Sequence, residues 1–153
     1  MPRISSVVIF ASVFGGCAPK DTVPPAVDSA APGAVAATQP LPTSPVGSWR
    51  WVSVVTPVET IQAPTTGQYT LIIDDSTANG VADCNRLMSK ATWTETQLSF
   101  GPIATTKMGC PPGGMGDRYL KFLGGAAVWF FRTDTLFVDL MADSGTMRFV
   151  RTE

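Results

Sequence analysis

Short apolar runs with a period of two residues fill the chain from Val46 onward, and this period restricts what the chain can fold into. In residues 47–55 it places Trp49 and Trp51 on one face of an extended strand, while polar turn residues separate one run from the next. The chain is therefore expected to be mainly β. The clearest runs are 47–55, 68–74, 127–132, 135–141 and 146–151, and weaker ones are 80–84, 91–94, 97–100 and 104–108.

Residues 115–123 break this period and favour an α-helix. Paired glycines precede the segment at 113–114 and follow it at 124–125, as expected of a C-terminal glycine cap. Asp117 falls in the first turn, where a carboxylate faces the positive end of the helix dipole. Because closing a sheet removes its exposed edges, we expect a small antiparallel β-barrel of about eight strands with one α-helix near residues 115–124. The apolar face consists of Met115, Tyr119, Leu120, Phe122 and Leu123.

The first sixteen residues have the pattern of a lipoprotein signal peptide. Arg3 precedes an apolar run at 4–13, which is too short to span a membrane. Small residues then precede Cys17, as in a bacterial lipobox, so we expect Cys17 to be lipidated and to anchor the chain. Ala18 after the cysteine resembles the pattern of outer-membrane sorting. The alternative is an ordinary secretory signal with a leftover cysteine.

Residues 17–45 predict a tether. The segment is rich in proline and alanine and has no aromatic residue around which a core could form. Pro-rich chains run extended at about 3 Å per residue, so this one can reach several tens of Å from a membrane. A plain spacer is the favoured interpretation, and a ligand for a proline-binding module is the alternative. The folded domain then spans residues 46–153.

Composition excludes most catalytic and nucleic-acid-binding classes. The chain has no histidine, three cysteines and a net charge of −1. Without imidazole there is no nucleophile system that passes its proton through histidine and no zinc site built on histidine. Three thiolates cannot complete a four-cysteine zinc site, and a near-neutral charge offers no basic face to nucleic acid. We therefore expect no enzyme, no catalytic residue, no metal, no cofactor and no nucleic-acid partner.

Residues 46–150 carry an ordered set of motifs: Gly47, Trp49, Gly80, Cys84, Asn85, Leu98, Phe100, Ile103, Thr106, Met108, Cys110 and Asp117. This set resembles the META domain, a family that includes heat-inducible outer-membrane lipoproteins of bacteria. Asp83 stands where the family usually has glycine, and it tolerates a left-handed backbone better than most residues. The resemblance implies a small antiparallel barrel with a single helix, export with lipid anchoring, association with heat stress and antibiotic tolerance, and no established enzymatic activity.

Cys84 and Cys110 lie within two of these motifs. In an oxidising periplasm, two cysteines in one small domain are most simply a disulfide, and we favour that pairing. A redox-active or metal-binding dithiol and a pair of buried thiols are the alternatives. Asn85 is expected to hydrogen-bond the local turn. Together with Thr106 and Met108 it makes up the motif around the cysteines.

Three aromatic residues in the run at 127–132 offer a further candidate site. Trp129 and Phe130 face opposite sides of their strand, so at least one ring should lie away from the main core. If that side opens into a crevice beside the helix, Trp129, Phe130 and Phe131 could bind an acyl chain or an apolar peptide segment. Packing within the core and on the second face is the alternative.

Two functions follow. The first is a non-catalytic protein of the bacterial cell envelope, lipid-anchored in the outer membrane and facing the periplasm, that supports envelope integrity or stress and antibiotic tolerance through protein contacts. The second is a binder of a hydrophobic small molecule or lipid in a barrel crevice. Apolar residues aimed at a real cavity would favour the second function, and a solid barrel with an exposed apolar stripe would favour the first.

Overall fold

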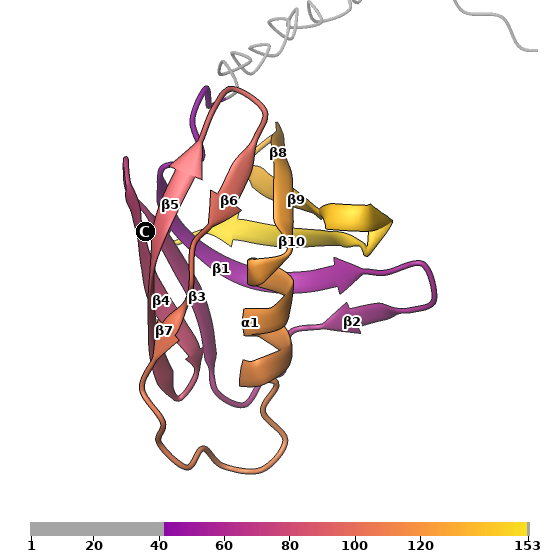
Figure 1. The fold of residues 1–153 in the computed structure, drawn as a ribbon. Coiled ribbons are helices and arrows are strands. Elements are labelled where there is room, and N and C mark those ends of the chain that lie inside the picture. The colour runs from indigo at the N-terminus through magenta and orange to yellow at the C-terminus, as the bar shows by residue number, and fades with distance from the viewer. Residues whose placement is uncertain (1–41, 153) are drawn as a thin grey trace, which may run out of the picture. The chain divides into compact units, whose positions relative to one another are not determined.

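The computed structural model describes residues 42–152, and the expected signal peptide, most of the tether and Cys17 lie outside them. Ten antiparallel strands form the sheet, and one α-helix lies among the described residues (Figure 1). The mainly β fold expected from the sequence is confirmed. The elements are β1 (Gly47–Val55), β2 (Thr60–Gln62), β3 (Gln68–Ile73), β4 (Thr77–Asp83), β5 (Asn85–Trp93), β6 (Leu98–Phe100), β7 (Ala104–Thr105), α1 (Gly116–Gly124), β8 (Ala126–Arg132), β9 (Thr135–Leu140), the 3₁₀ turn η1 (Met141–Asp143) and β10 (Thr146–Arg151).

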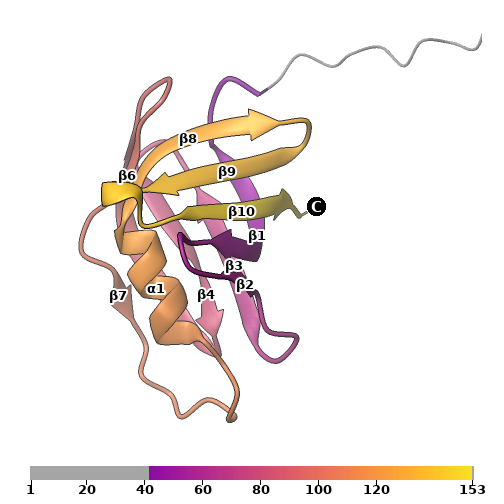
Figure 2. The same ribbon diagram turned by 90° about the vertical axis from the view of Figure 1, so that its right-hand side faces the viewer.

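Eight of the strands curve into a nearly closed barrel. Their order is β6-β5-β4-β3-β1-β10-β9-β8, while β2 pairs with β1 and β7 pairs with β5. The two ends of this path meet where Gln97 bridges Val128 and where the Trp129 N–H donates to the Thr96 carbonyl at 2.9 Å. Figure 2 shows β6 beside β8 at this junction. The expected eight-stranded antiparallel barrel is therefore confirmed, and its seam is short.

The interior of the barrel is filled with large side chains. Trp49 and Trp51 point inward from β1, as their spacing predicts, and both are 0% exposed. Their indole N–H groups donate to the carbonyl oxygens of Pro45 at 2.9 Å and Ser53 at 2.8 Å, so neither is buried without a partner. The other large side chains with less than 2% exposure are Tyr119, Phe149, Leu71, Ile73, Leu98, Leu123, Leu136, Met147, Val54 and Val138.

Helix α1 packs its apolar face onto the sheet. Tyr119 and Leu123 are buried, and the Tyr119 ring lies 5.2 Å from Trp51 between centroids. Asp117 lies in the first turn, as predicted. Gly125 is the C-cap of the helix, as predicted; its φ is −95°, so it caps without the left-handed conformation, and its N–H donates to the Phe122 carbonyl at 2.9 Å. The chain passes directly into β8 at Ala126, so no reversal of the backbone is needed there.

The hairpin of β4 and β5 is tighter than the sequence predicts. β4 ends at Asp83 and β5 begins at Asn85, so Cys84 alone separates two strands that were expected to be short and apart. Asp83 turns the chain with a left-handed φ of +66°, which confirms the reason for an Asp at this position. The strand expected at 104–108 covers only Ala104–Thr105. Strand β2 was not predicted, because three residues carry too little periodicity to be recognised.

Candidate functional site

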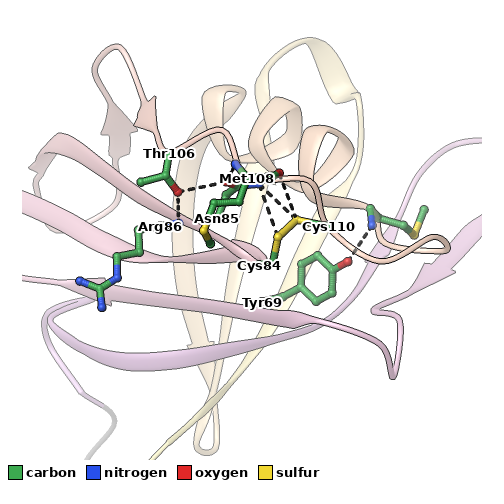
Figure 3. The surroundings of a disulfide bond; sticks show 8 residues. Tyr69, Cys84, Asn85, Arg86, Thr106, Met108 and Cys110 are labelled. Carbon is green, nitrogen blue, oxygen red and sulfur yellow. Dashed lines mark hydrogen bonds between the residues drawn. A yellow bond between two sulfur atoms is a disulfide. The ribbon is translucent and has the colours of Figure 1, made fainter.

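A disulfide ties the β4–β5 turn to the long loop that leads into α1. Cys84 and Cys110 are bonded with their Cα atoms 5.5 Å apart, and they are separated by 26 residues in the sequence. Figure 3 shows the bond beneath the loop. The favoured pairing is therefore present in the structure. A bonded pair has no thiolate free to bind metal or attack a substrate, so the bond acts here as a covalent staple.

The Asn85 side chain hydrogen-bonds the loop at Thr106 and Met108, just beyond the end of β7. Its Oδ1 accepts hydrogen bonds from the Met108 N–H at 2.7 Å and from Thr106 Oγ1 at 3.0 Å. Its Nδ2 donates to the Met108 carbonyl at 3.3 Å and to Cys110 Sγ at 3.2 Å (Figure 3). Thr106 Oγ1 in turn accepts from the Arg86 N–H at 3.0 Å. The three motif residues are thus brought together, and Met108 contributes its backbone while its side chain is 58% exposed.

A cavity of about 690 Å³ lies between this loop and the beginning of α1. Its lining mixes apolar side chains such as Met108, Met115 and Leu120 with charged ones. Asp83 at its wall is 8% exposed, and its carboxylate forms no ion pair with residues 42–152. A Cβ on Gly114 would stand 1.8 Å from this carboxylate, so glycine is required there. A second cavity, of about 680 Å³, lies against Trp51, Tyr69 and the β2–β3 loop, with residues from Arg50 to Thr70 in its lining.

Tyr119 on α1 and Tyr69 on β3 are both held in their neutral form. Burial raises the pKa of Tyr119, whose hydroxyl donates to the Thr70 carbonyl at 3.2 Å. Burial also raises the pKa of Tyr69; the Met115 N–H that donates to its oxygen at 2.6 Å opposes this shift, and the nearby Asp83 charge adds to it. Among residues 42–152 no three His, Cys, Asp or Glu side chains are placed to hold a metal ion. The arrangement orders the loop between β7 and α1.

Strand β8 divides the three predicted apolar site residues between two faces. Trp129 and Phe131 point into the core with 5% and 8% exposure, and their ring centroids lie 5.5 Å apart. Trp129 also donates its indole N–H to the Thr94 carbonyl at 2.8 Å near the barrel seam. Phe130 lies half-buried on the outer face, where it stacks on Phe137 of β9 with centroids 5.2 Å apart. The strand's alternation agrees with the sequence-based expectation, but no single crevice collects the three rings.

Sequence reasoning missed the surroundings of Phe130. Phe137 is its cross-strand partner, and the Arg132 guanidinium lies 5.6 Å from the centre of the Phe130 ring and 5.9 Å from that of Phe137. The alternation at 135–141 could have placed Phe137 on the face opposite Leu136. It could not have aligned Phe137 with Phe130, because that needs the register between β8 and β9.

Comparison with known proteins supports the fold. The family model named META domain matches residues 43–153. A solved NMR structure of a protein from Burkholderia xenovorans superimposes with a TM-score of 0.59 at 25% sequence identity, covering 69% of this chain and 81% of that one. The curated proteins yield no significant match. Among residues 42–152 no helix has the length and apolar character to cross a membrane.

Proposed function

Because the chain belongs to the META domain family, we propose that it is a non-catalytic protein of the bacterial cell envelope that acts through protein contacts. In this proposal acylation of Cys17 anchors it in the outer membrane, and the Pro-rich tether lets the domain reach partners in the periplasm. Its role there is to support envelope integrity and tolerance of stress or antibiotics. Cys17 itself lies outside the described residues.

The filled barrel is the observation that carries this proposal. A barrel that stores a lipid needs an internal space, whereas here inward-facing side chains occupy the space that the strands enclose. Trp49, Trp51 and Tyr119 alone bring three large aromatic groups to the centre, each 0% exposed. An acyl chain could enter only by displacing them, at a cost comparable to unpacking a core. Contacts on the outside of the domain are therefore the favoured means of action.

The proposal that the protein is non-catalytic rests on the side chains that the chain has and lacks. The whole chain lacks histidine, and its two cysteines within residues 42–152 are joined to each other. General acid–base catalysis by two carboxylates would need a second acid beside the buried one. The one buried acid among residues 42–152, Asp83, has glycines and the neutral Tyr69 as neighbours.

The rival function is binding of a hydrophobic small molecule or lipid. The two cavities of about 690 and 680 Å³ favour it, because both have the size of pockets that hold small ligands, about 300 to 1,000 Å³. Both lie at the rim of the filled interior, so the rival requires a ligand that is held outside the barrel core.

Native mass spectrometry of the full protein, extracted from bacterial envelopes, separates the two. We expect the covalent lipid mass to vanish in Cys17→Ser, and we expect no further bound mass. A few hundred daltons that leave under organic solvent would overturn the proposal in favour of the ligand binder. Met115→Trp, which narrows the cavity beside the loop, should then remove that mass, while Met88→Trp at a 60% exposed site serves as the matched control.

A further inference from the structure

We propose that the outer face of β8, β9, β10 and β1 is a docking surface for an acidic segment of a partner protein. This inference rests on the proposed function and names the chemistry of the partner. We call this surface the arginine face. It consists of Arg50, Arg132 and Arg148 with Phe130, Phe137 and Val150.

Strand register brings these residues together from three separate stretches of the chain. Phe130 pairs with Phe137, which pairs with Arg148 on the next strand. One row away, Arg132 is connected through Thr135 and Val150 to Arg50. Figure 2 shows β8, β9 and β10 side by side. With neighbouring strands about 4.8 Å apart, the Cα atoms of the three arginines lie roughly 8 to 15 Å from one another.

The stacked rings hold one guanidinium in place. Phe130 and Phe137 are almost parallel, with 7° between their planes, and Arg132 lies over both of them. A guanidinium held on aromatic faces keeps its planar set of donors for an incoming carboxylate and loses little conformational freedom when it binds. Such a preorganised cation favours a bidentate carboxylate partner.

The charge on this face is not neutralised within the described domain. All three arginines are exposed, and the one salt bridge among residues 42–152 joins Arg118 to Glu59 elsewhere. Asp139 is the single carboxylate among the paired residues of this face, and it already accepts a hydrogen bond from Thr146. Asp134 lies in the turn beyond Arg132. Three cations around an apolar centre therefore call for a partner that brings carboxylates and a small apolar contact.

A protein partner fits this surface better than a lipid bilayer does. Membrane docking needs apolar side chains that project far enough to insert, and both phenylalanines are half-buried against the sheet. Between Arg132 and Arg50 the row holds Thr135 and Val150, and Val128 on the same side of β8 as Phe130 is 40% exposed. The face thus has a small apolar centre of half-buried rings with exposed arginines around it, like the core and rim of a protein interface.

Site-specific photo-crosslinking tests the proposal in the full chain, expressed in its own host. The photoreactive residue p-benzoylphenylalanine replaces Phe137 on the arginine face, or Ile72, which is 42% exposed on the outer side of β3, as the matched control. We expect a discrete protein adduct from position 137 alone, with a net negative crosslinked peptide. Adding Arg132→Gln and Arg148→Gln should lower its yield about tenfold or more. Arg86→Gln with Lys90→Gln, on β5, should leave it unchanged.

Several outcomes would overturn the inference. These are the absence of an adduct, an adduct that persists without the two arginines, a neutral or basic crosslinked peptide, and crosslinking to phospholipid or to a second copy. Circular dichroism of the arginine variants verifies that they fold, since exposed arginines contribute little to stability. Native mass spectrometry remains the separate readout for the proposed function. A non-covalently bound mass of a few hundred daltons would contradict that function whatever the crosslinking shows.

Discussion

Replacing both bonded cysteines, as Cys84→Ser with Cys110→Ser, should lower the free energy of unfolding by about 3.5 kcal/mol. The magnitude follows from the 26 residues that separate the two cysteines, because the bond closes a loop of that size in the unfolded chain. Loop closure of that length removes about 12 cal/mol/K of entropy, which is about 3.5 kcal/mol at 25 °C. In the folded state Asn85 keeps its bonds to Thr106 and Met108, so the loop should retain its path.

Urea unfolding followed by tryptophan fluorescence measures this loss, since Trp49 and Trp51 are both buried. The urea m-value should rise because the unfolded chain is no longer cross-linked, and in thermal unfolding the midpoint temperature should fall by about 15 °C. Asn85→Ala with the bond intact is the comparison, and it should cost about 1–3 kcal/mol with no change in m. A loss below about 1 kcal/mol in the double serine variant, or an unchanged m, would refute the loop-closure reasoning. Clean thiol labelling of both cysteines without reductant would refute the bond itself.

Two further predictions concern residues in the core and beside it. Gly80→Ala should lower the free energy of unfolding by about 1–3 kcal/mol in urea, because the new Cβ would stand 2.1 Å from the Thr70 carbonyl oxygen. Gly109→Ala is the control and should change stability little, since no atom lies within 4 Å of its Cβ. Equal losses in the two variants would contradict the steric reason. Because burial raises the pKa of Tyr119 above that of the unfolded chain, near 10, stability should fall by up to about 1.4 kcal/mol per pH unit above pH 10 and stay unaffected by this group below it. Absorbance titration of the folded protein should show Tyr119 still neutral at pH 10 and Tyr69 ionising at a higher pH than a free tyrosine, and a normal titration of both would contradict their burial.

Local patterns predicted much of the fold because they report backbone geometry directly. Alternation in residues 47–55 placed Trp49 and Trp51 in the core, and the structure ends β1 at the expected residues. The change to a helical period located α1 to within a residue or so. Aspartate tolerates a left-handed backbone, and Asp83 adopts one. In each case the feature depends on residues within one helical turn or one pleat of a strand, so the local sequence is enough to predict it.

The candidate site was predicted less completely than the fold. The chemistry of an oxidising compartment favoured the bond between Cys84 and Cys110, and the structure contains it. The role of Asn85 was expected to be local, yet its side chain holds Met108, which lies 23 residues away. Sequence periodicity cannot predict a hydrogen bond between a side chain and the backbone of a distant loop, since nothing in the nearby sequence shows which backbone groups the side chain will meet.

The sequence by itself determined the mainly β character, the helix, the inward face of β1 and the absence of histidine chemistry. Only the tertiary structure decided the strand order, the short seam between Gln97 and Val128, and the stacking of Phe130 on Phe137 beneath Arg132. The physical reason is register. Which face a residue takes follows from its own strand, whereas its cross-strand neighbours depend on how distant strands align, and a shift of one residue would send Arg132 and Phe130 to the opposite face.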